Sequence, residues 1–437
     1  MPSTDKILEY LGGLERHGIR PGLERIKRLL SALGDPQEAY PCVHIAGTNG
    51  KGSTSAFISS VLIEAGFRTG VYTSPHLIKF NERIRVGSRM ISDADIGRLA
   101  ASVKKAASIP DADGDEPTFF EFTTAMAFEY FREKKIDIAV IETGLGGRLD
   151  ATNVITPVAG VITNIGIDHE EFLGSDIRSI AAEKAGIMKK GVAFFTAEDK
   201  TVPLSIMKAH AGKTKARLCV MGADFSASPL CGPKGRRATF DYTGTTLELK
   251  GCSLGLAGAH QIKNAACAIA AIEGLVAKGL RIPRSAIRAG LKKAVWPGRM
   301  ETVSKNPLVV FDCAHNPDGA ATLERALKDM RYKRLILVIG VMQDKDINRI
   351  LERLVPLAST VIVTEPKTTR AEPAPALAVR IAPYKKEVVI KTDVRGALKE
   401  AVARAAKSDM VLVTGSIFTV GEAKRAIKGV LKRAGGL

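Results

Sequence analysis

Short apolar runs bounded by turn residues alternate along the chain with longer segments of helical periodicity. Apolar runs of this kind predict buried strands, and their alternation with helices predicts parallel sheets of the α/β class. The first series comprises "CVHIAG", "TGVYTS", "IDIAVIET", "VAGVITN" and "VAFFTA". The second series comprises "LVVFDC", "LILVIG", "TVIVTE", "EVVIK" and "MVLVTG". The sequence therefore predicts two doubly wound α/β sheets.

The pattern departs from this alternation on either side of the first series. Helical patterns near residues 4–18 and 22–33 precede its first strand. Residues 216–256, with "ARLCVMG", "ATFDYTG" and "TLELKG", predict a small antiparallel β patch. A long helix is expected to follow from "HQIKNAACAIAAIEGL". The final stretch "GEAKRAIKGVLKRAGGL" predicts a solvated amphipathic helix.

A domain boundary is predicted at "VWPGRM", residues 295–300. This segment holds the only tryptophan of the chain, together with a proline and a glycine, and it follows a helical pattern. A chain of 437 residues is too long for one compact core, so two or three domains are expected. We therefore expect an N-terminal domain of residues 1–297 and a C-terminal domain of residues 298–437.

Composition narrows the range of partners. Lys and Arg number 64 against 46 Asp and Glu, which gives a formal net charge of +18. The basic residues are dispersed and aromatic content is only 5%, whereas single-strand binders interleave basic and stacking aromatic side chains. Small polyanionic substrates are therefore favoured over nucleic acid. A basic ATPase stimulated by nucleic acid stays open as an alternative from a different class.

The cysteines and the apolar runs bear on location. The six cysteines show no paired spacing, which favours reduced thiols and argues against a structural zinc site. The first turns of the chain carry charges, and no apolar run approaches membrane-spanning length. We expect a cytoplasmic monomer without a membrane segment.

The stretch "HIAGTNGKGST", residues 44–54, is predicted to bind nucleotide phosphates. It has two residues rather than four between its first glycine and Gly50, and Gly52 separates Lys51 from Ser53. Glycines let backbone N–H groups approach phosphate oxygens, and Lys51 adds a positive charge. A helix is expected to begin at Gly52 or Ser53, from which Ser53 can reach a metal ion.

Three further loops, "SPH", "ETGLGGRLDATN" and "NIGIDHEE", follow predicted strands and are expected at the same sheet edge. They contain the oxygen-rich side chains that Mg²⁺ prefers, and a carboxylate that ends an apolar strand is costly without a partner. The candidate ligands are Ser74, Glu142, Asp150, Asp168 and His169. Singly, Asp168 fits a helix cap and His169 an ordinary hydrogen-bonded histidine, but their joint placement favours a metal site. "GLGGR" lacks the G-x-G-x-x-G spacing, so a dinucleotide site is rejected.

The second series ends two strands with polar residues. "FDCAHNPDG" places Asp312, His315 and Asn316 at a strand end, and "TGSIFTVGE" does the same for Ser416. These residue types also favour plain turns. Because both segments are expected at one sheet edge, a second binding face is favoured.

An ordered set of long motifs runs between about residues 20 and 421. Its members are "HIAGTNGKGST", "TSPHL" followed by "NERI", "FFEFTTAMAF", "ETGLGGRLDATN", "DHEEFLG", "IAAEKAGIMK", "HQIKNA", "PGRM" and "FDCAHNPDG". This set resembles the folylpolyglutamate synthases and dihydrofolate synthases of the Mur ligase superfamily. The resemblance implies a P-loop-type ATPase domain followed by a Rossmann-like glutamate-ligase domain. The implied reaction uses ATP and two Mg²⁺ ions to join L-glutamate to dihydropteroate or a folate through an acyl phosphate.

The resemblance also implies roles for individual residues. The implied catalytic residues are Lys51, Glu142, His169 and Lys184, with Lys184 carbamylated to serve the second metal ion. The implied nucleotide contacts are Thr48, Asn49, Gly50, Lys51, Gly52, Ser53, Asn264, Arg299 and Asp312. The implied metal ligands are Ser53, Ser74, Glu142, His169 and Lys184. The implied substrate contacts are Gly22, Leu23, Thr124, Leu149, Asp150 and Ala151 for the pterin, and His315 and Ser416 for glutamate.

Two alternatives stay open within this resemblance. The motifs fit the first glutamate addition, later additions, or both. Another amino-acid ligase of the superfamily is also considered, but the enzymes of cell-wall synthesis carry a UDP-sugar-binding domain ahead of the phosphate loop. Here only about two helical patterns precede that loop.

Overall fold

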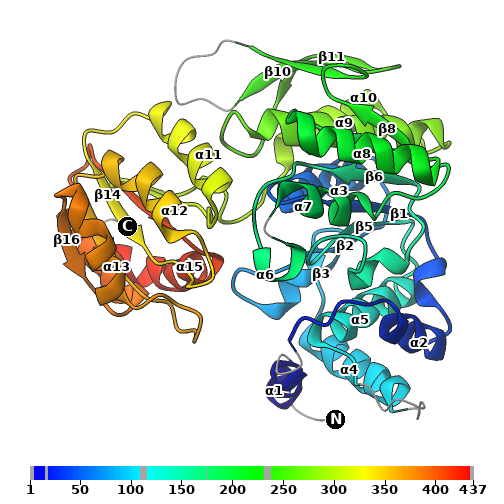
Figure 1. The fold of residues 1–437 in the computed structure, drawn as a ribbon, viewed down its shortest axis with the longest axis horizontal. Helices are drawn as coiled ribbons and strands as arrows, with labels where there is room; N and C mark the ends of the chain where they lie inside the picture. The colour runs from blue at the N-terminus through cyan, green and yellow to red at the C-terminus, as the bar shows by residue number, and fades with distance from the viewer. Residues whose placement is uncertain (1–3, 15–17, 109–115, 175, 231–237, 434–437) are drawn as a thin grey trace.

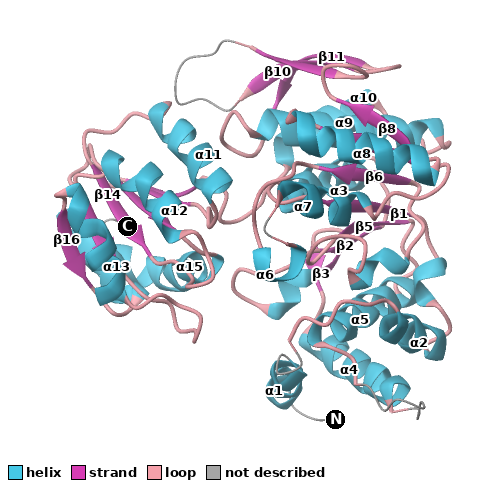
Figure 2. Ribbon diagram, in the orientation of Figure 1, coloured by secondary structure: helices cyan, strands magenta, loops and turns pink. Residues whose placement is uncertain are grey.

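Two β-sheets, each flanked by helices, make up the structure (Figures 1 and 2). The computed structural model describes residues 4–14, 18–108, 116–174, 176–230 and 238–433. The first series of predicted strands contributes to an eight-stranded sheet, and the second series to a six-stranded sheet. The predicted α/β class with two doubly wound sheets is confirmed.

The eight-stranded sheet is parallel except at one edge, where β3 and β4 run antiparallel. Its strands, in spatial order, are β4 (Arg89–Met90), β3 (Ile84–Val86), β2 (Thr69–Tyr72), β5 (Ile138–Glu142), β1 (Cys42–Ala46), β6 (Ala159–Ile162), β7 (Ala193–Thr196) and β8 (Arg217–Val220). β1 pairs with β5 on one side and β6 on the other, and all five of its residues are buried. The loops that follow β1, β5 and β6 therefore meet at one edge of the sheet.

The sequence pattern assigned β8 to the wrong sheet. "ARLCVMG" is predicted in the antiparallel patch, but β8 pairs in parallel with β7. Only Cys219 and Val220 of this edge strand are buried, so its half-exposed pattern resembles that of an antiparallel strand. The antiparallel patch itself has three strands, β9 (Ser226–Pro229), β10 (Thr239–Thr243) and β11 (Glu248–Ser253).

Helices cover both faces of the large sheet. One face packs against α3 (Lys51–Glu64), α9 (Gln261–Ala277) and α10 (Arg284–Lys293). The other face packs against α1 (Thr4–Leu14), α2 (Glu24–Ala32), α4 (Asp93–Ala107), α5 (Phe119–Glu133), α6 (Glu170–Leu173), α7 (Ile177–Ala185) and α8 (Thr201–Thr214). The two predicted opening helices correspond to α1 and α2, although residues 15–17 of the first prediction lie outside the described residues.

The six-stranded sheet carries one strand that the sequence pattern missed. Its order is β12 (Glu301–Lys305), β13 (Leu308–Phe311), β17 (Met410–Thr414), β14 (Leu335–Ile339), β15 (Thr360–Val363) and β16 (Glu387–Ile390). β12 is an antiparallel edge strand of mixed polarity, and such a strand gives no continuous apolar run. The flanking helices are α11 (Pro317–Lys328), α12 (Ile347–Leu354) and α13 (Ala374–Ile381) on one face, and α14 (Val394–Arg404) and α15 (Ile417–Arg433) on the other.

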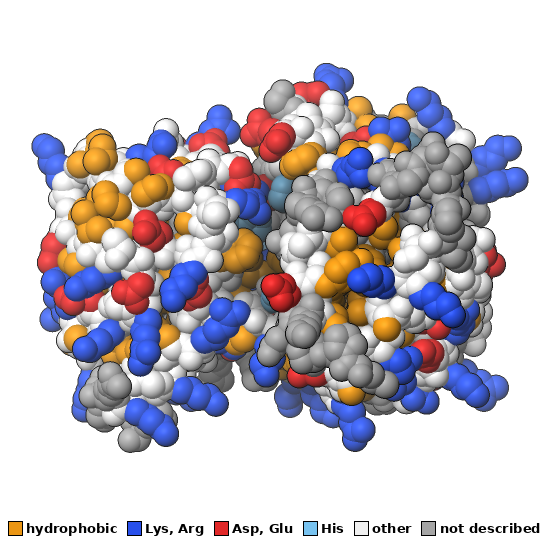
Figure 3. All heavy atoms as spheres, turned by 90° about the horizontal axis from the view of Figure 1, so that it is seen from below, with side chains coloured by type: hydrophobic (Ala, Val, Ile, Leu, Met, Phe, Trp, Pro, Cys, Tyr) orange, Lys and Arg blue, Asp and Glu red, His pale blue; other side chains and the backbone are white. Residues whose placement is uncertain are grey.

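The two sheet units touch through loops at the strand ends. The chain passes from α10 to β12 through residues 294–300, where the boundary is expected. The loop after β2 inserts Leu77 into the core of the C-terminal unit, and Arg425 of α15 donates a 2.7 Å hydrogen bond to the carbonyl of Ile78. On the face shown in Figure 3, Lys and Arg are spread over both units with Asp and Glu among them. No helix within the described ranges is long and apolar enough to cross a bilayer.

A substitution at Gly290 of α10 tests how closely α10 packs against α3, the helix that follows the phosphate loop. A Cβ at Gly290 would lie 2.5 Å from the Cα of Val61 in α3, so Gly290→Ala must push α10 off α3. We expect the free energy of unfolding to fall by about 1–3 kcal/mol, measured by urea denaturation. Gly212→Ala on α8 is the control, because nothing lies within 4 Å of its added Cβ, and it should be neutral or slightly stabilising. A loss at both positions would show that helix packing is not the cause.

Candidate active site at the junction of the two units

The phosphate loop connects β1 to α3 and is packed from three sides. Gly47 and Gly50 have φ angles of 144° and 88°, which favour glycine. A Cβ at Gly47 would collide with Thr163, and one at Gly50 with Asn264. A Cβ at Gly52 would lie 2.6 Å from the ring of Trp296. α3 begins at Lys51, one or two residues earlier than expected, because Gly50 in the left-handed region ends the loop.

Two lysine side chains converge on one carbonyl of this loop. Lys51 Nζ donates to the carbonyl oxygens of Gly47 at 2.9 Å and Thr48 at 3.4 Å. Lys184 Nζ, on α7, donates to the same Gly47 oxygen at 3.2 Å. The Lys184 side chain is buried, and burial together with the charge of Lys51 lowers its pKa to about 7. A large fraction of Lys184 is therefore the neutral amine near physiological pH.

Glu142 ends β5 beside the phosphate loop. It is buried, and its Oε2 atom has no hydrogen-bond partner among the described residues. Burial raises the pKa of Glu142 to about 7, although Lys51, Arg299 and a backbone hydrogen bond from Ser74 oppose the rise. An unpartnered carboxylate oxygen beside a phosphate loop suits a Mg²⁺ ion, which usually takes one or two carboxylates together with phosphate oxygens.

The predicted metal ligands do not form a site in which protein side chains alone coordinate the ion. In the described part of the chain, no group of three or more His, Cys, Asp or Glu side chains is placed to hold a metal ion. The predicted set instead mixes the hydroxyls of Ser53 and Ser74 with Glu142, His169 and Lys184. Ser53 is buried on the first turn of α3 and lines a cleft between the two units. Such a mixed set fits an ion that is completed by substrate oxygens.

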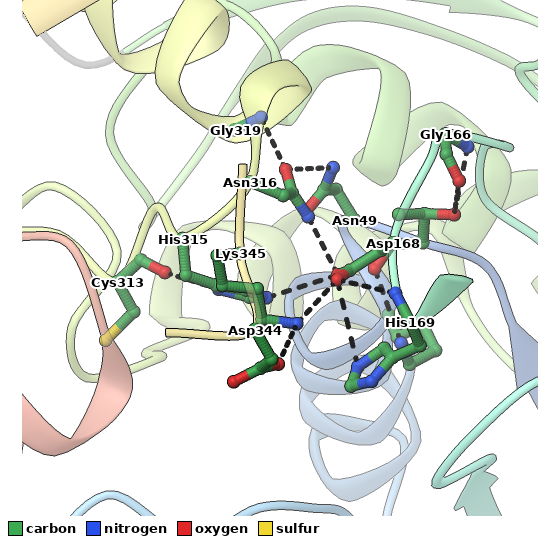
Figure 4. A network of polar contacts seen from close by, with 12 residues as sticks. Asn49, Gly166, Asp168, His169, Cys313, His315, Asn316, Gly319, Asp344 and Lys345 are labelled. Atoms are coloured by element: carbon green, nitrogen blue, oxygen red, sulfur yellow. Dashed lines mark hydrogen bonds and ion pairs between the residues drawn. The ribbon is translucent and has the colours of Figure 1, made fainter. Parts of the chain in front are cut away.

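Asp168 and His169 face the C-terminal unit (Figure 4). Asp168 pairs with Lys345 at 2.7 Å and with His315 at 3.4 Å, and Asn316 Nδ2 donates to it at 3.0 Å. Burial opposes ionisation of Asp168, but the hydrogen bond and charge of His315 and the charges of His169 and Lys345 hold its pKa well below its usual range. The sequence interpretation of Asp168 as a helix cap or metal ligand missed this ion pair, because the partner Lys345 lies far away in the chain.

His169 lies next to Asp168 with a left-handed backbone, φ 55°. Its Nε2 atom is 4.0 Å from Asp168 Oδ1. Burial lowers the pKa of His169 to about 4, with the charge of Asp168 opposing and those of Lys345 and Lys51 assisting. The imidazole is therefore neutral at pH 7, which is the form that binds a metal ion.

A cleft of about 530 Å³ lies between the units and collects most of the predicted nucleotide contacts. Its walls include Asn49, Gly50, Ser53, Asn264, Arg299 and Asp312. Asp312 accepts hydrogen bonds from the backbone N–H groups of Met300 and Ala314, both at 2.9 Å, which fixes the segment that carries Arg299. Sequence reasoning missed other wall residues, namely Asn164, Lys200, His260 and Asp318. Asn164, His260 and Asp318 lie in motifs that the sequence singled out without naming these residues, whereas Lys200 lies in no such motif and is brought here by the fold alone.

The predicted pterin contacts have mixed surroundings. Asp150 accepts hydrogen bonds from the N–H groups of Leu145 at 2.8 Å and Thr152 at 3.0 Å, so its carboxylate holds the loop together. Thr124 is buried in α5, with its hydroxyl 3.2 Å from that of Tyr72. The remaining predicted contacts lie in two segments. Gly22 and Leu23 come directly before α2, and half-buried Leu149 and buried Ala151 flank Asp150. Their substrate roles stay predictions.

An aromatic wall near these residues was missed. Phe119 and Phe120 are half-buried at the start of α5, and the rings of Phe120 and Tyr72 stack with centroids 6.0 Å apart. A Cβ at Gly144 would lie 2.5 Å from the Phe120 ring, so the "GLGG" loop lies directly against it. The signal was present in "TFFE", where a Thr118 cap is followed by two adjacent aromatic residues; both pack against the core and both stay partly exposed.

The predicted glutamate contacts differ in their surroundings. His315 Nδ1 donates to the Cys313 carbonyl at 2.9 Å, which turns Nε2 toward Asp168. Ser416 Oγ instead accepts a 3.0 Å hydrogen bond from the Thr419 N–H at the start of α15. His315 therefore lies at the interdomain network, whereas Ser416 acts as a helix cap in this structure. Both glutamate roles stay predictions.

A phosphate loop at one sheet edge, closed over by a second α/β unit, defines a ligase of the Mur type. The family model of the Mur ligase middle domain matches residues 45–272, and that of the Mur ligase glutamate ligase domain matches residues 298–417. A dihydrofolate synthase/folylpolyglutamate synthase of Bacillus subtilis is 36% identical over 432 residues, which cover 96% of this chain and 98% of the relative. The chain belongs to the folylpolyglutamate synthase/dihydrofolate synthase family.

Solved structures of this family share the whole fold. Escherichia coli FolC in complex with DHPP and ADP has a TM-score of 0.89 and 32% sequence identity, covering 98% of this chain and 99% of that chain. A bifunctional folylpolyglutamate synthase/dihydrofolate synthase with Mn, AMPPNP and L-glutamate bound has a TM-score of 0.87 and 31% identity, covering 98% and 99%. The enzymes that this chain resembles over its length are ATP-dependent glutamate ligases.

Lys184 makes the stability of the ligand-free protein depend on pH. Its pKa falls from about 10.5 in the unfolded chain to about 7 in the folded protein, so between these values only the unfolded state takes up a proton as pH falls. The free energy of unfolding of the wild type minus that of Lys184→Met should therefore decrease from pH 10 to pH 7, by a few kcal/mol. Denaturant unfolding in CO₂-free buffer measures this difference. The exposed Lys190→Met is the control and should give a flat difference; a flat difference for Lys184→Met as well would contradict the assignment.

Proposed function

We propose that this protein is an ATP-dependent ligase that adds L-glutamate to dihydropteroate and to folates through an acyl-phosphate intermediate. The observation that carries the proposal is the convergence at one edge of the large sheet of the phosphate loop, the unpartnered Oε2 atom of Glu142 and the two-sided nucleotide cleft. Phe119 and Phe120, which stay half-buried near that edge, suit a flat pterin ring. The names of the similar proteins agree with this reaction class.

The chemistry explains why ATP is needed. A carboxylate is a poor electrophile, because its oxygen is a poor leaving group. Transfer of the γ-phosphoryl group to the substrate carboxylate converts that oxygen into phosphate, which leaves readily. The amine of glutamate then attacks the acyl carbon, and an amide, ADP and phosphate result. The protein supplies positioning and charge stabilisation for both steps.

The residues of this chain divide that work. The phosphate loop with Lys51 holds the triphosphate, and Asn264, Arg299 and Asp312 orient the nucleotide from the far wall. Ser53, Ser74, Glu142 and His169 would hold Mg²⁺, and a carbamylated Lys184 would serve the second ion. The ions, when bound, neutralise the charge that develops on the transferred phosphoryl group. Neutral His169 and the low pKa of the Lys184 amine support these ligand roles.

Closure of two domains, residues 1–297 and 298–437, is part of the proposal. The nucleotide cleft has walls from both sides of this boundary, and Asp168 bonds to Lys345 across it. His315, beside Asp168, is our candidate for the glutamate side. We expect the enzyme to work as a cytoplasmic monomer, which suits the free, buried cysteines of the described chain.

Glutamate incorporation tests the proposal directly. Radiolabelled L-glutamate should enter product with dihydropteroate and with tetrahydrofolate, in each case only with MgATP. Lys51→Ala should lower turnover by about a hundredfold or more, because it removes a charge that faces the developing phosphoryl charge. Lys293→Ala is the control, since that ammonium pairs with Glu64 on the exposed surface at 2.7 Å. ATP hydrolysis that requires nucleic acid and does not depend on glutamate would contradict the proposal.

The carbamate of Lys184 has its own test. The ammonium first loses one proton; the neutral amine then attacks CO₂, a nitrogen–carbon bond forms and the nitrogen loses a second proton, which leaves an anionic oxygen ligand in place of a cation. Wild-type protein under ¹³CO₂ should show a carbamate carbon signal by NMR that is absent in Lys184→Arg. Lys184→Arg should also fail to restore the activity lost in Lys184→Ala, because a permanent cation cannot become a ligand. An active preparation of the wild type without that signal would refute the carbamate.

A further inference from the structure

Arg85 is a half-buried cation with two buried nitrogen atoms that no acceptor in the described chain satisfies. It lies on β3, and its Nε and Nη2 atoms are buried without a hydrogen-bond acceptor among the described residues. A guanidinium remains charged in proteins, and an unpaired buried charged donor is costly. Burial lowers the pKa of Arg85, which is the direction expected for such a group. The fold therefore keeps a side chain with two buried polar atoms that lack partners among the described residues.

The position of Arg85 is fixed by Trp296. The Arg85 Cζ atom lies 5.3 Å from the centre of the Trp296 ring, in a cation–π contact. The same ring also lies against Gly52, where an added Cβ would lie 2.6 Å from it. Arg85 pairs in register with Val71 of β2. Arg85, Trp296 and Gly52 thus form a continuous stack from the edge of the large sheet to the first turn of the phosphate-loop helix.

The carboxylates that act on Arg85 do not bond to it. Glu82 and Glu142 are the acidic side chains whose charges favour its protonated form. The Glu82 carboxylate is taken up by three backbone N–H groups, those of Leu77 at 2.8 Å, Ile78 at 2.9 Å and Lys79 at 2.8 Å. Glu142 is a candidate metal ligand, and its Oε2 atom has no hydrogen-bond partner in the described part of the chain. A guanidinium on one side and a carboxylate on the other suit a ligand that carries an oxyanion and a cation together.

We propose that Arg85 is a substrate-binding residue that donates to an oxyanion of the reacting groups. Its planar fork matches the oxygens of a phosphoryl group or a carboxylate, and the Trp296 platform holds that fork in one plane. The two oxyanions that meet in the reaction are the γ-phosphoryl group of the nucleotide and the carboxylate of the acyl substrate. The identity of these two groups rests on the proposed function. The proposal that an oxyanion contacts Arg85 rests on its unpartnered Nε and Nη2 atoms and on the Trp296 platform.

Calorimetry with two pairs of ligands shows whether Arg85 contacts the γ-phosphoryl group or the substrate carboxylate. The affinity of MgAMPPNP relative to MgADP measures contacts to the γ-phosphoryl group. The affinity of dihydropteroate relative to its methyl ester measures contacts to the carboxylate. In Arg85→Met, one of these two ratios should fall about ten- to a hundredfold, the range for one charge-assisted contact. Arg85→Lys should recover part of that loss, because it keeps the charge but not the fork.

The controls distinguish binding from structure. Arg89→Met removes an exposed arginine from neighbouring β4 and should change neither ratio. The fluorescence of Trp296, the only tryptophan, should respond to the ligand whose ratio falls, and that response should weaken in Arg85→Met. If both ratios match those of the wild type while the melting temperature falls, Arg85 is only a strut for Trp296 and the inference is wrong. A wild type that binds these ligands without incorporating glutamate would instead refute the proposed function and leave the Arg85 contact intact.

Discussion

The close packing of three neighbours on a glycine-rich loop is the constraint on which the site depends. A strand-end threonine, an asparagine of α9 and the interdomain tryptophan contact the loop where Gly47, Gly50 and Gly52 leave no room for a side chain. Because these neighbours come from different parts of the fold, one short loop sets the relative positions of the large sheet, its covering helix and the segment that leads to the second unit. A longer loop with the usual P-loop spacing would collide with these three neighbours unless they moved.

Buried charge is the second organising feature. Lys51 and Lys184 donate to one carbonyl oxygen, and Glu142 lies nearby with an unpartnered oxygen. Burial pushes the pKa of Lys184 down and that of Glu142 up, so both groups are biased toward their neutral forms in the ligand-free protein. A phosphate with its metal ion supplies opposite charges to these groups. Burying these groups lowers the stability of the ligand-free protein. A bound ligand relieves that cost, so the cost favours the ligand-bound state.

The contact between the two units is polar and reaches the phosphate loop itself. The side-chain amides of Asn49 and Asn316 exchange hydrogen bonds of 3.2 and 3.1 Å, and Asn316 also bonds to Asp168. Lys345 completes the network with a side chain that is only 7% exposed. Interfaces of this kind, unlike apolar cores, can be remade when a charged ligand arrives. The network therefore gives a physical route by which nucleotide at the loop can influence how the second unit sits.

The sequence by itself determined the two α/β sheets, the place of the phosphate loop and the family, because strand periodicity, glycine spacing and long motifs are local properties of the chain. It misplaced β8, whose half-exposed pattern resembles that of an antiparallel strand, and it missed β12 for lack of an apolar run. Only the tertiary structure paired Asp168 with Lys345, turned Ser416 into a helix cap and stacked Arg85 on Trp296. Each of these depends on which distant side chain lies within a few ångströms and on how deeply both are buried, and packing decides both.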